Sequence, residues 1–256
     1  MREELETNGV QVIAQATVTS IDEREGRLAV VADPDLIVDA DTVLVVVGVR
    51  PDAKLGQEAG VETGEKGALQ VNRRMETNLP GVYAAGDCVV TYHRLLDADS
   101  YLPLGTTAHK QGRVAGENAV GGERTFEGSL GTQVVKVFEL AVARTGLRDE
   151  EAAAAGFEAL TVESSGFDHK VHYPEAQTIS MRLTGDRRSG RLLGVQLLGR
   201  LGSEVPKRID IAATALHHGM TVDALNDLDL SYTPPFGSPW DAVQAGAQAW
   251  SAAVAP

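Results

Sequence analysis

The eleven residues from Thr77 to Asp87 constrain the fold more than any other segment of the chain. They read T-N-L-P-G-V-Y-A-A-G-D, in which a strand-like run at 82–85 leads directly into Gly86 and the carboxylate of Asp87. Glycine has no Cβ atom, so the backbone at Gly86 can come into close contact with a ligand. The alternative is a surface turn after a buried strand, in which Asp87 only caps the next segment of the chain.

The pattern T-x-x-P-x-h-Y-A-x-G-D resembles the second flavin-binding motif of the FAD-dependent pyridine nucleotide-disulfide oxidoreductases. The resemblance implies that Gly86 and Asp87 contact FAD and that Asp87 hydrogen-bonds a ribityl hydroxyl. Members of that family bind FAD and NAD(P)H through two G-x-G-x-x-G turns, which seat each pyrophosphate at a helix N-terminus. This sequence contains no G-x-G. We therefore expect an FAD half-site and an incomplete NAD(P)H site, as in the C-terminal portion of a larger flavoenzyme.

The single cysteine, Cys88, follows the motif directly, where members of that family often have a cysteine without a redox role. We interpret it as a partly buried packing residue, so the redox cysteine of the family's disulfide reductases is absent. One cysteine forms no internal disulfide, and the histidines at 93, 169, 217 and 218 show no metal-ligand spacing. No metal site is predicted. These histidines are expected to be solvated or locally hydrogen-bonded, and the 186–188 turn to be a solvated loop.

The charge of the chain limits the partners it can have. Lys and Arg number 23 against 36 Asp and Glu, which gives a formal net charge of −13 without any basic run. This balance argues against nucleic acid as a partner. The start, M-R-E-E-L-E, predicts a charged helix rather than a signal peptide, and no apolar run approaches the roughly 20 residues that span a bilayer. We expect a cytoplasmic protein that binds neither nucleic acid nor a membrane.

The order of predicted elements indicates an α/β plus α+β fold, with a partial FAD/NAD(P)-binding domain followed by an α+β dimerisation domain. We place a remnant of the NAD(P)H-binding domain at 1–48, the second half of the FAD-binding domain at 49–123 and the dimerisation domain at 124–256. In the first region, a helix ends at Asn8-Gly9, and the apolar run 43–47 predicts a strand buried on both faces. The other strands expected across the chain lie at 10–21, 27–31, 36–38, 132–138, 160–165, 178–183 and 192–198.

A helix is predicted from about Thr106 to Val120, with Thr106 or Thr107 as its N-cap. Its first turn carries free N–H groups and a partial positive charge of about +0.5. The family resemblance implies that Thr106, Thr107 and Ala108 contact the flavin there. The alternative is a structural helix, whose small residues at 112, 115, 116 and 119 serve only to pack a close neighbour.

Residues 227–241, D-L-D-L-S-Y-T-P-P-F-G-S-P-W-D, resemble the tail of the coenzyme A-disulfide reductase, NADH oxidase and persulfide reductase branch. The resemblance implies that Tyr232 reaches across a dimer to the partner's flavin and redox cysteine, where a phenol can donate a hydrogen bond or act as a general acid. It also matches Tyr173, more weakly, to a tyrosine that lines the coenzyme A pocket. The alternative is an aromatic cluster that only packs a dimer interface.

The helices of this last region are predicted from their caps. Ser203 and Ser238 are expected to begin two helices, each with a proline in its first turn. Spacing along the second helix predicts that Trp240 and Trp250 share one apolar face.

The function expected from the resemblance is that of the C-terminal portion of an FAD-dependent NAD(P)H oxidoreductase. Its substrate would be coenzyme A disulfide, a persulfide or oxygen, and the chain alone is expected to be inactive and homodimeric. Two alternatives stay open: a non-catalytic dimeric module, and one half of a split flavoenzyme whose N-terminal half is a separate chain.

Overall fold

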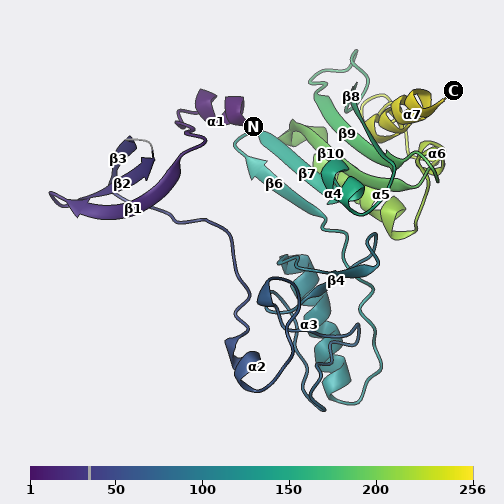
Figure 1. The fold of residues 1–256 in the computed structure, drawn as a ribbon. Coiled ribbons are helices and arrows are strands. Elements are labelled where there is room, and N and C mark those ends of the chain that lie inside the picture. The colour runs from purple at the N-terminus through teal and green to yellow at the C-terminus, as the bar shows by residue number, and fades with distance from the viewer. Residues whose placement is uncertain (34–35, 256) are drawn as a thin grey trace. The chain divides into compact units, whose positions relative to one another are not determined.

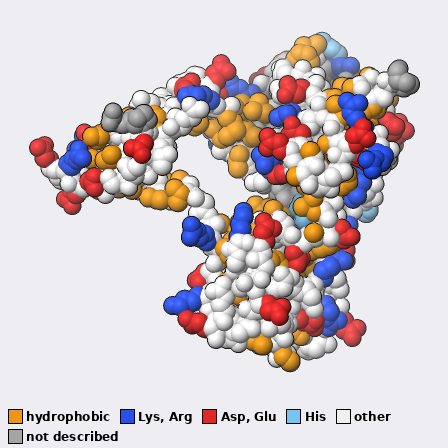
Figure 2. Space-filling view, viewed as in Figure 1, with side chains coloured by type: hydrophobic (Ala, Val, Ile, Leu, Met, Phe, Trp, Pro, Cys, Tyr) orange, Lys and Arg blue, Asp and Glu red, His pale blue; other side chains and the backbone are white. Residues whose placement is uncertain are grey.

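The computed structural model describes residues 1–33 and 36–255, which divide into two compact units at Val49 (Figure 1). Acidic and basic side chains are interspersed over the face of the molecule seen in Figure 2. Within the described ranges no helix is long and apolar enough to cross a membrane.

The first unit contains one short helix and one small antiparallel sheet. Helix α1 (Arg2–Thr7) ends at Asn8, and Gly9 has a φ of +81°, which confirms the predicted helix end. The sheet has the order β1-β2-β3, and only Ala29 and Ala32 are buried among the described residues of this unit. Its strands are β1 (Thr17–Arg24), β2 (Arg27–Asp33) and β3 (Leu36–Ala40).

The strand predicted at 43–47 is absent, because residues 43–50 have no regular secondary structure. The side chains of Leu44, Val46 and Val47 are 82%, 80% and 90% exposed. A buried parallel strand needs neighbours that accept and donate its backbone hydrogen bonds, and the described chain offers none to this run. The run is apolar enough for a buried strand, but a strand is stable only within a sheet.

The second unit begins with a small irregular region built around α3 (Gly105–Ala119). The run 82–85, predicted as a strand, forms only an isolated bridge between Glu76 and Tyr83. The core of this region contains Leu69, Val89, Val90 and Val114, all buried. The remaining elements are α2 (Lys54–Glu58), the 3-10 turn η1 (Glu65–Gly67), β4 (Thr91–His93) and β5 (Ala98–Ser100).

The rest of the second unit is a five-stranded antiparallel sheet in the order β6-β7-β10-β9-β8. The strands expected near 132–138, 160–165, 178–183 and 192–198 are confirmed, whereas the strand at 140–146 was not predicted. Helices α5 and α7 pack on this sheet, α5 against β7 and β10 and α7 against β8 and β9. The elements are β6 (Gln133–Val137), β7 (Leu140–Gly146), α4 (Asp149–Ala154), β8 (Ala159–Phe167), β9 (Thr178–Asp186), β10 (Leu192–Arg200), η2 (Leu201–Ser203), α5 (Val205–His217), α6 (Val222–Asn226) and α7 (Ala242–Val254).

Both helix caps predicted in this region were wrong. Helix α5 follows Glu204 rather than Ser203, which lies in the preceding 3-10 turn. Helix α7 starts after Asp241 rather than Ser238: the carboxylate of Asp241 accepts the N–H of Val243 at 3.0 Å, and Gln244 Oε1 accepts the N–H of Asp241 at 3.1 Å. This reciprocal pair satisfies two backbone donors at once, so it outcompetes a serine three residues earlier.

The two tryptophans do not share a face. Trp250 is buried against the sheet, 3% exposed, and its indole N–H donates to the carbonyl of Leu160 at 2.9 Å. Trp240 precedes α7 and is 54% exposed. Helical spacing could not relate them, because the helix begins only after Trp240.

The turn at 186–188 is likewise more ordered than predicted. Asp186 is buried and accepts the N–H of Glu158 at 3.0 Å and the Ser189 hydroxyl at 2.5 Å. Its carboxylate therefore organises the hairpin between β9 and β10 instead of lying in solvent.

Candidate flavin half-site and tyrosine loops

The turn at Gly86 is fixed against helix α3. Gly86 has a φ of +91°, and its N–H donates to Oε1 of the fully buried Gln111 at 3.0 Å. Gln111 in turn donates from Nε2 to the Thr91 hydroxyl at 3.1 Å. A Cβ atom at Gly86 would lie 3.7 Å from that of Ala108 in the first turn of α3. The motif and the helix start, far apart in the sequence, are therefore neighbours in the fold.

Asp87 presents a carboxylate with no internal partner. Its backbone carbonyl accepts the hydroxyl of Tyr101 at 3.0 Å, which holds the turn in place. The side chain is exposed, and it makes no hydrogen bond or ion pair with any residue that the structure describes. Both carboxylate oxygens are thus available to hydroxyl donors of a ligand.

Helix α3 starts without a side-chain cap. Its N-cap is Leu104, so the prediction that Thr106 or Thr107 caps the helix was wrong. The Thr107 hydroxyl pairs instead with Ser129 Oγ at 3.1 Å, and Thr106 is exposed. An uncapped start leaves the first N–H groups of the helix without intrahelical partners, which favours negative charge beside them.

The small-residue face of α3 is only partly covered, since Ala115 packs against the core of this region. A Cβ atom added at Gly112 or Gly116 would meet nothing within 4 Å. At Gly112 and Gly116 the described chain therefore supplies no close neighbour.

Cys88 is partly buried, as predicted from its position, and its thiol contacts the carbonyl of Ala85 at 3.5 Å. Burial raises the pKa of the Cys88 thiol, and the nearby charges of Asp87 and Asp52 raise it further. A thiol that stays protonated near neutral pH is a poor nucleophile. The environment of Cys88 suits packing rather than redox chemistry.

The two tyrosines singled out from the sequence lie on loops that contact each other. Tyr232 is 45% exposed and precedes a tight turn in which the N–H of Phe236 donates to the Thr233 carbonyl at 2.9 Å. The N–H of Lys170, in the loop that carries Tyr173, donates to the Pro234 carbonyl at 3.1 Å. This bond joins the Tyr173 loop to the Tyr232 loop.

Arg208, which no sequence motif singled out, holds both loops. Its side chain is buried, and Nε lies 2.9 and 3.2 Å from the carboxylate oxygens of Asp241. One terminal nitrogen donates to the carbonyl of Asp168 and the other to that of Ser203, each at 2.7 Å. Asp168 begins the Tyr173 loop and Asp241 ends the Tyr232 loop. One feature of the sequence could have indicated this role: Arg208 lies on the inner face of α5, where the other residues are apolar.

A pocket of about 320 Å³ opens beside these loops. Tyr173 and Phe236 are among its lining residues, whereas Tyr232 is not. No hydrogen bond or ion pair in the described ranges joins the tyrosine loops to the Gly86–Asp87 turn.

The remaining candidate residues make local contacts. His93 is buried, and its Nδ1 accepts the N–H of Leu95 at 3.3 Å, in line with the predicted local bonding. His169 Nδ1 lies 3.0 Å from Asp168. Across the residues described, no group of histidine, cysteine or carboxylate side chains is arranged to hold a metal ion.

Comparison with known proteins identifies the family to which this chain belongs. A family model described as pyridine nucleotide-disulphide oxidoreductase matches residues 1–112, and the dimerisation-domain model of the same family matches 132–242. The chain belongs to the pyridine nucleotide-disulphide oxidoreductase family, so the resemblance noted in the sequence is confirmed.

Within the family, the similar proteins include coenzyme A-dependent sulfur and disulfide reductases. The chain is 37% identical over 202 residues to the NAD(P)H sulfur oxidoreductase (CoA-dependent) of Pyrococcus furiosus, covering 79% of this chain and 45% of that protein. It is 32% identical over 206 residues to the coenzyme A disulfide reductase of Staphylococcus haemolyticus, covering 80% and 46%. The structure of an NAD-dependent persulfide reductase from A. fulgidus superimposes with a TM-score of 0.92 at 36% identity, covering 97% and 46%. The chain spans about half the length of the curated relatives it matches.

Proposed function

We propose that this chain supplies the C-terminal portion of an FAD-dependent NAD(P)H oxidoreductase that acts on coenzyme A disulfide, a persulfide or oxygen. The observation that carries the proposal is the unpartnered Asp87 carboxylate, held beside the uncapped start of α3 by the bond from Gly86 to Gln111. The names of the relatives support the substrate class. The predicted division into regions 1–48, 49–123 and 124–256 is part of the proposal.

The residues present fit one half of FAD. Asp87 would accept hydrogen bonds from ribityl hydroxyls, and Gly86 leaves room for the isoalloxazine-bearing end of the cofactor. The first turn of α3, at Thr106, Thr107 and Ala108, would stabilise negative charge on the reduced ring. When bound, FAD supplies two-electron transfer from NAD(P)H. None of these residues would hold either pyrophosphate, since the sequence lacks the glycine-rich turns.

The tyrosine loops would serve the substrate. Tyr232, half exposed on a loop that Pro234-Pro235 stiffens, would donate a hydrogen bond to a thiolate or peroxide in the active site of a partner subunit. Tyr173 would line the coenzyme A pocket. The role of Tyr232 requires a homodimer, which the match of the dimerisation-domain model supports. A cytoplasmic location is part of the proposal.

The first test is the visible absorption spectrum of the purified chain. We expect no tightly bound FAD, because Asp87 and α3 contact only the ribityl and isoalloxazine parts and leave the charged pyrophosphate without a cradle. A yellow protein that retains one flavin per chain after gel filtration would contradict the half-site.

The second test supplies the missing half. The chain alone is expected to show no NAD(P)H-dependent turnover, because hydride transfer needs nicotinamide stacked on flavin. Fusion to the part of the Pyrococcus furiosus relative that this chain does not match is expected to restore flavin binding. Asp87→Ala should then lower the flavin content, whereas Asp229→Ala, an exposed carboxylate without a hydrogen-bond partner in the described chain, should not.

The alternative is a dimeric module without catalysis. It is favoured by the exposed aromatic residues Phe236 and Trp240, 78% and 54% exposed, which suit an interface whether or not flavin is present. A fusion that folds and dimerises but never binds flavin would support this alternative. A separate N-terminal half would be supported if a second polypeptide restores flavin binding when it is mixed with this chain.

A further inference from the structure

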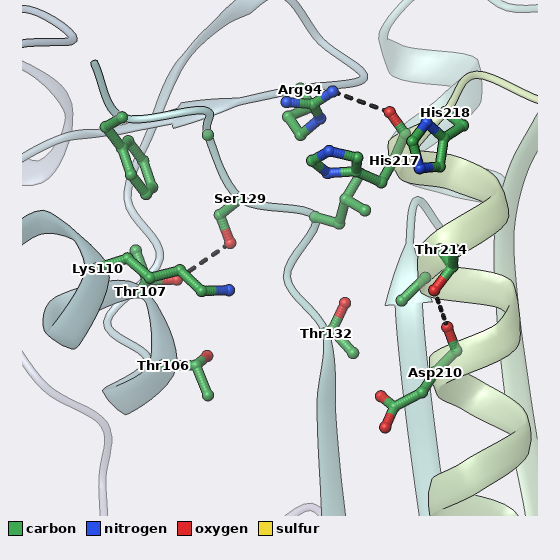
Figure 3. A pocket seen from close by; sticks show the side chains of 14 residues that line it. Arg94, Thr106, Thr107, Lys110, Ser129, Thr132, Asp210, Thr214, His217 and His218 are labelled. Carbon is green, nitrogen blue, oxygen red and sulfur yellow. Dashed lines mark hydrogen bonds between the residues drawn. The ribbon is translucent and has the colours of Figure 1, made fainter. Parts of the chain in front are cut away.

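A second pocket in the unit that begins at Arg50 shares Thr106 and Thr107 with the candidate flavin contacts but extends away from them toward α5. It has a volume of about 440 Å³ and lies between the first turns of α3 and the C-terminal half of α5 (Figure 3). Thr106 and Lys110 line it from α3, Asp210, Thr214 and His217 line it from α5, and His218 follows directly after that helix. Lys110 extends from α3 into the space between the helices (Figure 3). Gly86 approaches α3 on another side, at Ala108, which does not line this pocket.

The pocket is basic, although the chain carries a net charge of −13. Arg94, Lys110, His217 and His218 line it, and Asp210 is its one carboxylate among the described residues. An adjoining pocket of about 380 Å³ shares Arg94 and both histidines; it adds two more arginines, Arg73 and Arg191, and the carboxylate of Glu127. Together the two pockets are lined by four permanently charged cations and two carboxylates. The local charge is therefore positive although the net charge of the chain is negative, and a positive region concentrates anions.

Arg94 is held in a fixed position. It donates to the Glu127 carbonyl at 2.6 Å and to the His217 carbonyl at 2.9 Å, which ties the 126–132 segment to the end of α5. Gly128 makes this possible, because a Cβ atom there would lie 2.8 Å from Arg94 Cγ. The carboxylate of Glu127 is 3.4 Å from Arg94 and its side chain is 69% exposed, so water screens most of its charge.

Several donors that face the pocket have no internal partner. The Lys110 ammonium and the Thr106 hydroxyl make no hydrogen bond or ion pair within 1–33 and 36–255. The rings of His217 and His218 lie 5.1 Å apart, edge to face, and accept or donate no hydrogen bond in the same ranges. Burial lowers the pKa of His217, and the charges of Arg94, His218 and Lys110 lower it further, while Glu127 opposes them. A bound anion would add a negative charge to that of Glu127 and so offset the repulsion between these positive charges.

We propose that this pocket binds a phosphoryl group, held by the Lys110 ammonium and the His217 and His218 imidazoles beside the fixed Arg94 guanidinium. The donor set matches phosphate, which combines up to two negative charges with several acceptor oxygens near neutral pH. The volume exceeds what a free phosphate ion needs, so a phosphate monoester fits as well. The proposed phosphate donors, Lys110, His217, His218 and Arg94, are not among the candidate flavin contacts, although Thr106 and Thr107 line the same pocket.

The test is a titration of the purified chain with inorganic phosphate at constant ionic strength. Binding is detected through the ring signals of the histidines in NMR spectra. We expect saturable binding and an upward shift in the pKa of His217, because the anion offsets the neighbouring positive charges. Glycerol 2-phosphate, measured in parallel, distinguishes a monoester site from a site for the free ion: tighter binding of the ester identifies the former.

The matched variants are Lys110→Ala and Lys136→Ala. Lys136 lies on β6 outside both pockets, is exposed and has no partner in the described ranges, so it controls for the loss of one positive charge. Lys110→Ala should weaken phosphate binding at least about tenfold, equivalent to 1.4 kcal/mol, and Lys136→Ala by less than about twofold. Equal effects of the two variants, or no saturation and no shift at His217, would overturn the proposal.

Discussion

At the scale of single residues, the buried carboxylate of Asp186 couples stability to pH. Burial alone would raise the pKa of Asp186, but hydrogen bonds from the Ser189 hydroxyl and from backbone N–H groups outweigh burial and lower it. The folded state therefore gains stability above the ordinary pKa of 3.8, and this gain is lost as the pH falls through the lowered value.

Asp186→Asn should reduce the free energy of unfolding by about 1–3 kcal/mol at pH 7, because its amide NH₂ faces donors. In urea titrations the difference from the unmodified chain should shrink as the pH falls below the ordinary value. Asp229→Asn, on an exposed residue, is the control and should change little. A difference that stays constant down to about pH 2, below the ordinary range of an aspartate, would contradict the assignment.

Cys88 gives a second prediction at this scale. Because burial raises the pKa of its thiol, alkylation by iodoacetamide should reach half its maximal rate at a higher pH in the folded chain than in the urea-unfolded chain. The unfolded chain should behave like an ordinary cysteine, with a midpoint near about 8.5. A folded midpoint below that of the unfolded chain would indicate a reactive thiol and a role beyond packing.

Single residues were predictable where covalent structure dictates the answer. Gly9 adopts the positive φ expected of a glycine at a helix end, and the Pro234-Pro235 pair, expected to stiffen its loop, lies in a tight turn. Buried charges were not predictable, because they depend on partners distant in sequence. The Arg208 guanidinium reaches carbonyls at 168 and 203 and a carboxylate at 241, and no local pattern contains all three.

At the scale of elements, Arg208 links α5 to the two tyrosine loops, and breaking this link should be costly. Arg208→Met leaves the Asp241 carboxylate largely buried without its cation, and we expect a loss of about 3–5 kcal/mol in the free energy of unfolding. The adjacent Lys207→Ala breaks an exposed pair with Glu204 and should cost less than about 1 kcal/mol.

Amide hydrogen exchange provides a second readout of this link. In Arg208→Met, exchange should accelerate in both 168–177 and 227–241, since the arginine contacts the ends of both loops. Faster exchange in only one loop, or equal costs for the substitutions at 207 and 208, would show that the loops are held independently.

The elements themselves differ in how far sequence could predict them. The strands at 133–137, 159–167, 178–186 and 192–200 were expected, and each pairs with a neighbour inside this chain. The run at 43–47 carries the same kind of apolar signal but remains exposed, because no strand of the described chain pairs with it. Periodicity reports what a segment can bury, whereas pairing depends on which other segments are present.

At the scale of the whole molecule, the surface of residues 124–255 points to self-association. Tyr232, Phe236 and Trp240 are 45%, 78% and 54% exposed within a short stretch of loop. Three large aromatic side chains exposed so close together in the sequence are typical of an interaction surface. The dimerisation-domain model covers residues 132–242, which include all three side chains. Trp250, buried in the core, is excluded from this surface.

We therefore predict that the chain forms a two-fold dimer and that Trp240→Glu shifts it toward monomer, because aromatic anchors commonly dominate interfaces and a carboxylate there would be desolvated. Light scattering coupled to gel filtration at tens of micromolar measures the change. Val120→Glu is the matched control, since Val120 is 86% exposed but lies outside the proposed interface region. A monomeric unmodified chain, or equal dissociation by both variants, would contradict an interface built on the aromatic loop.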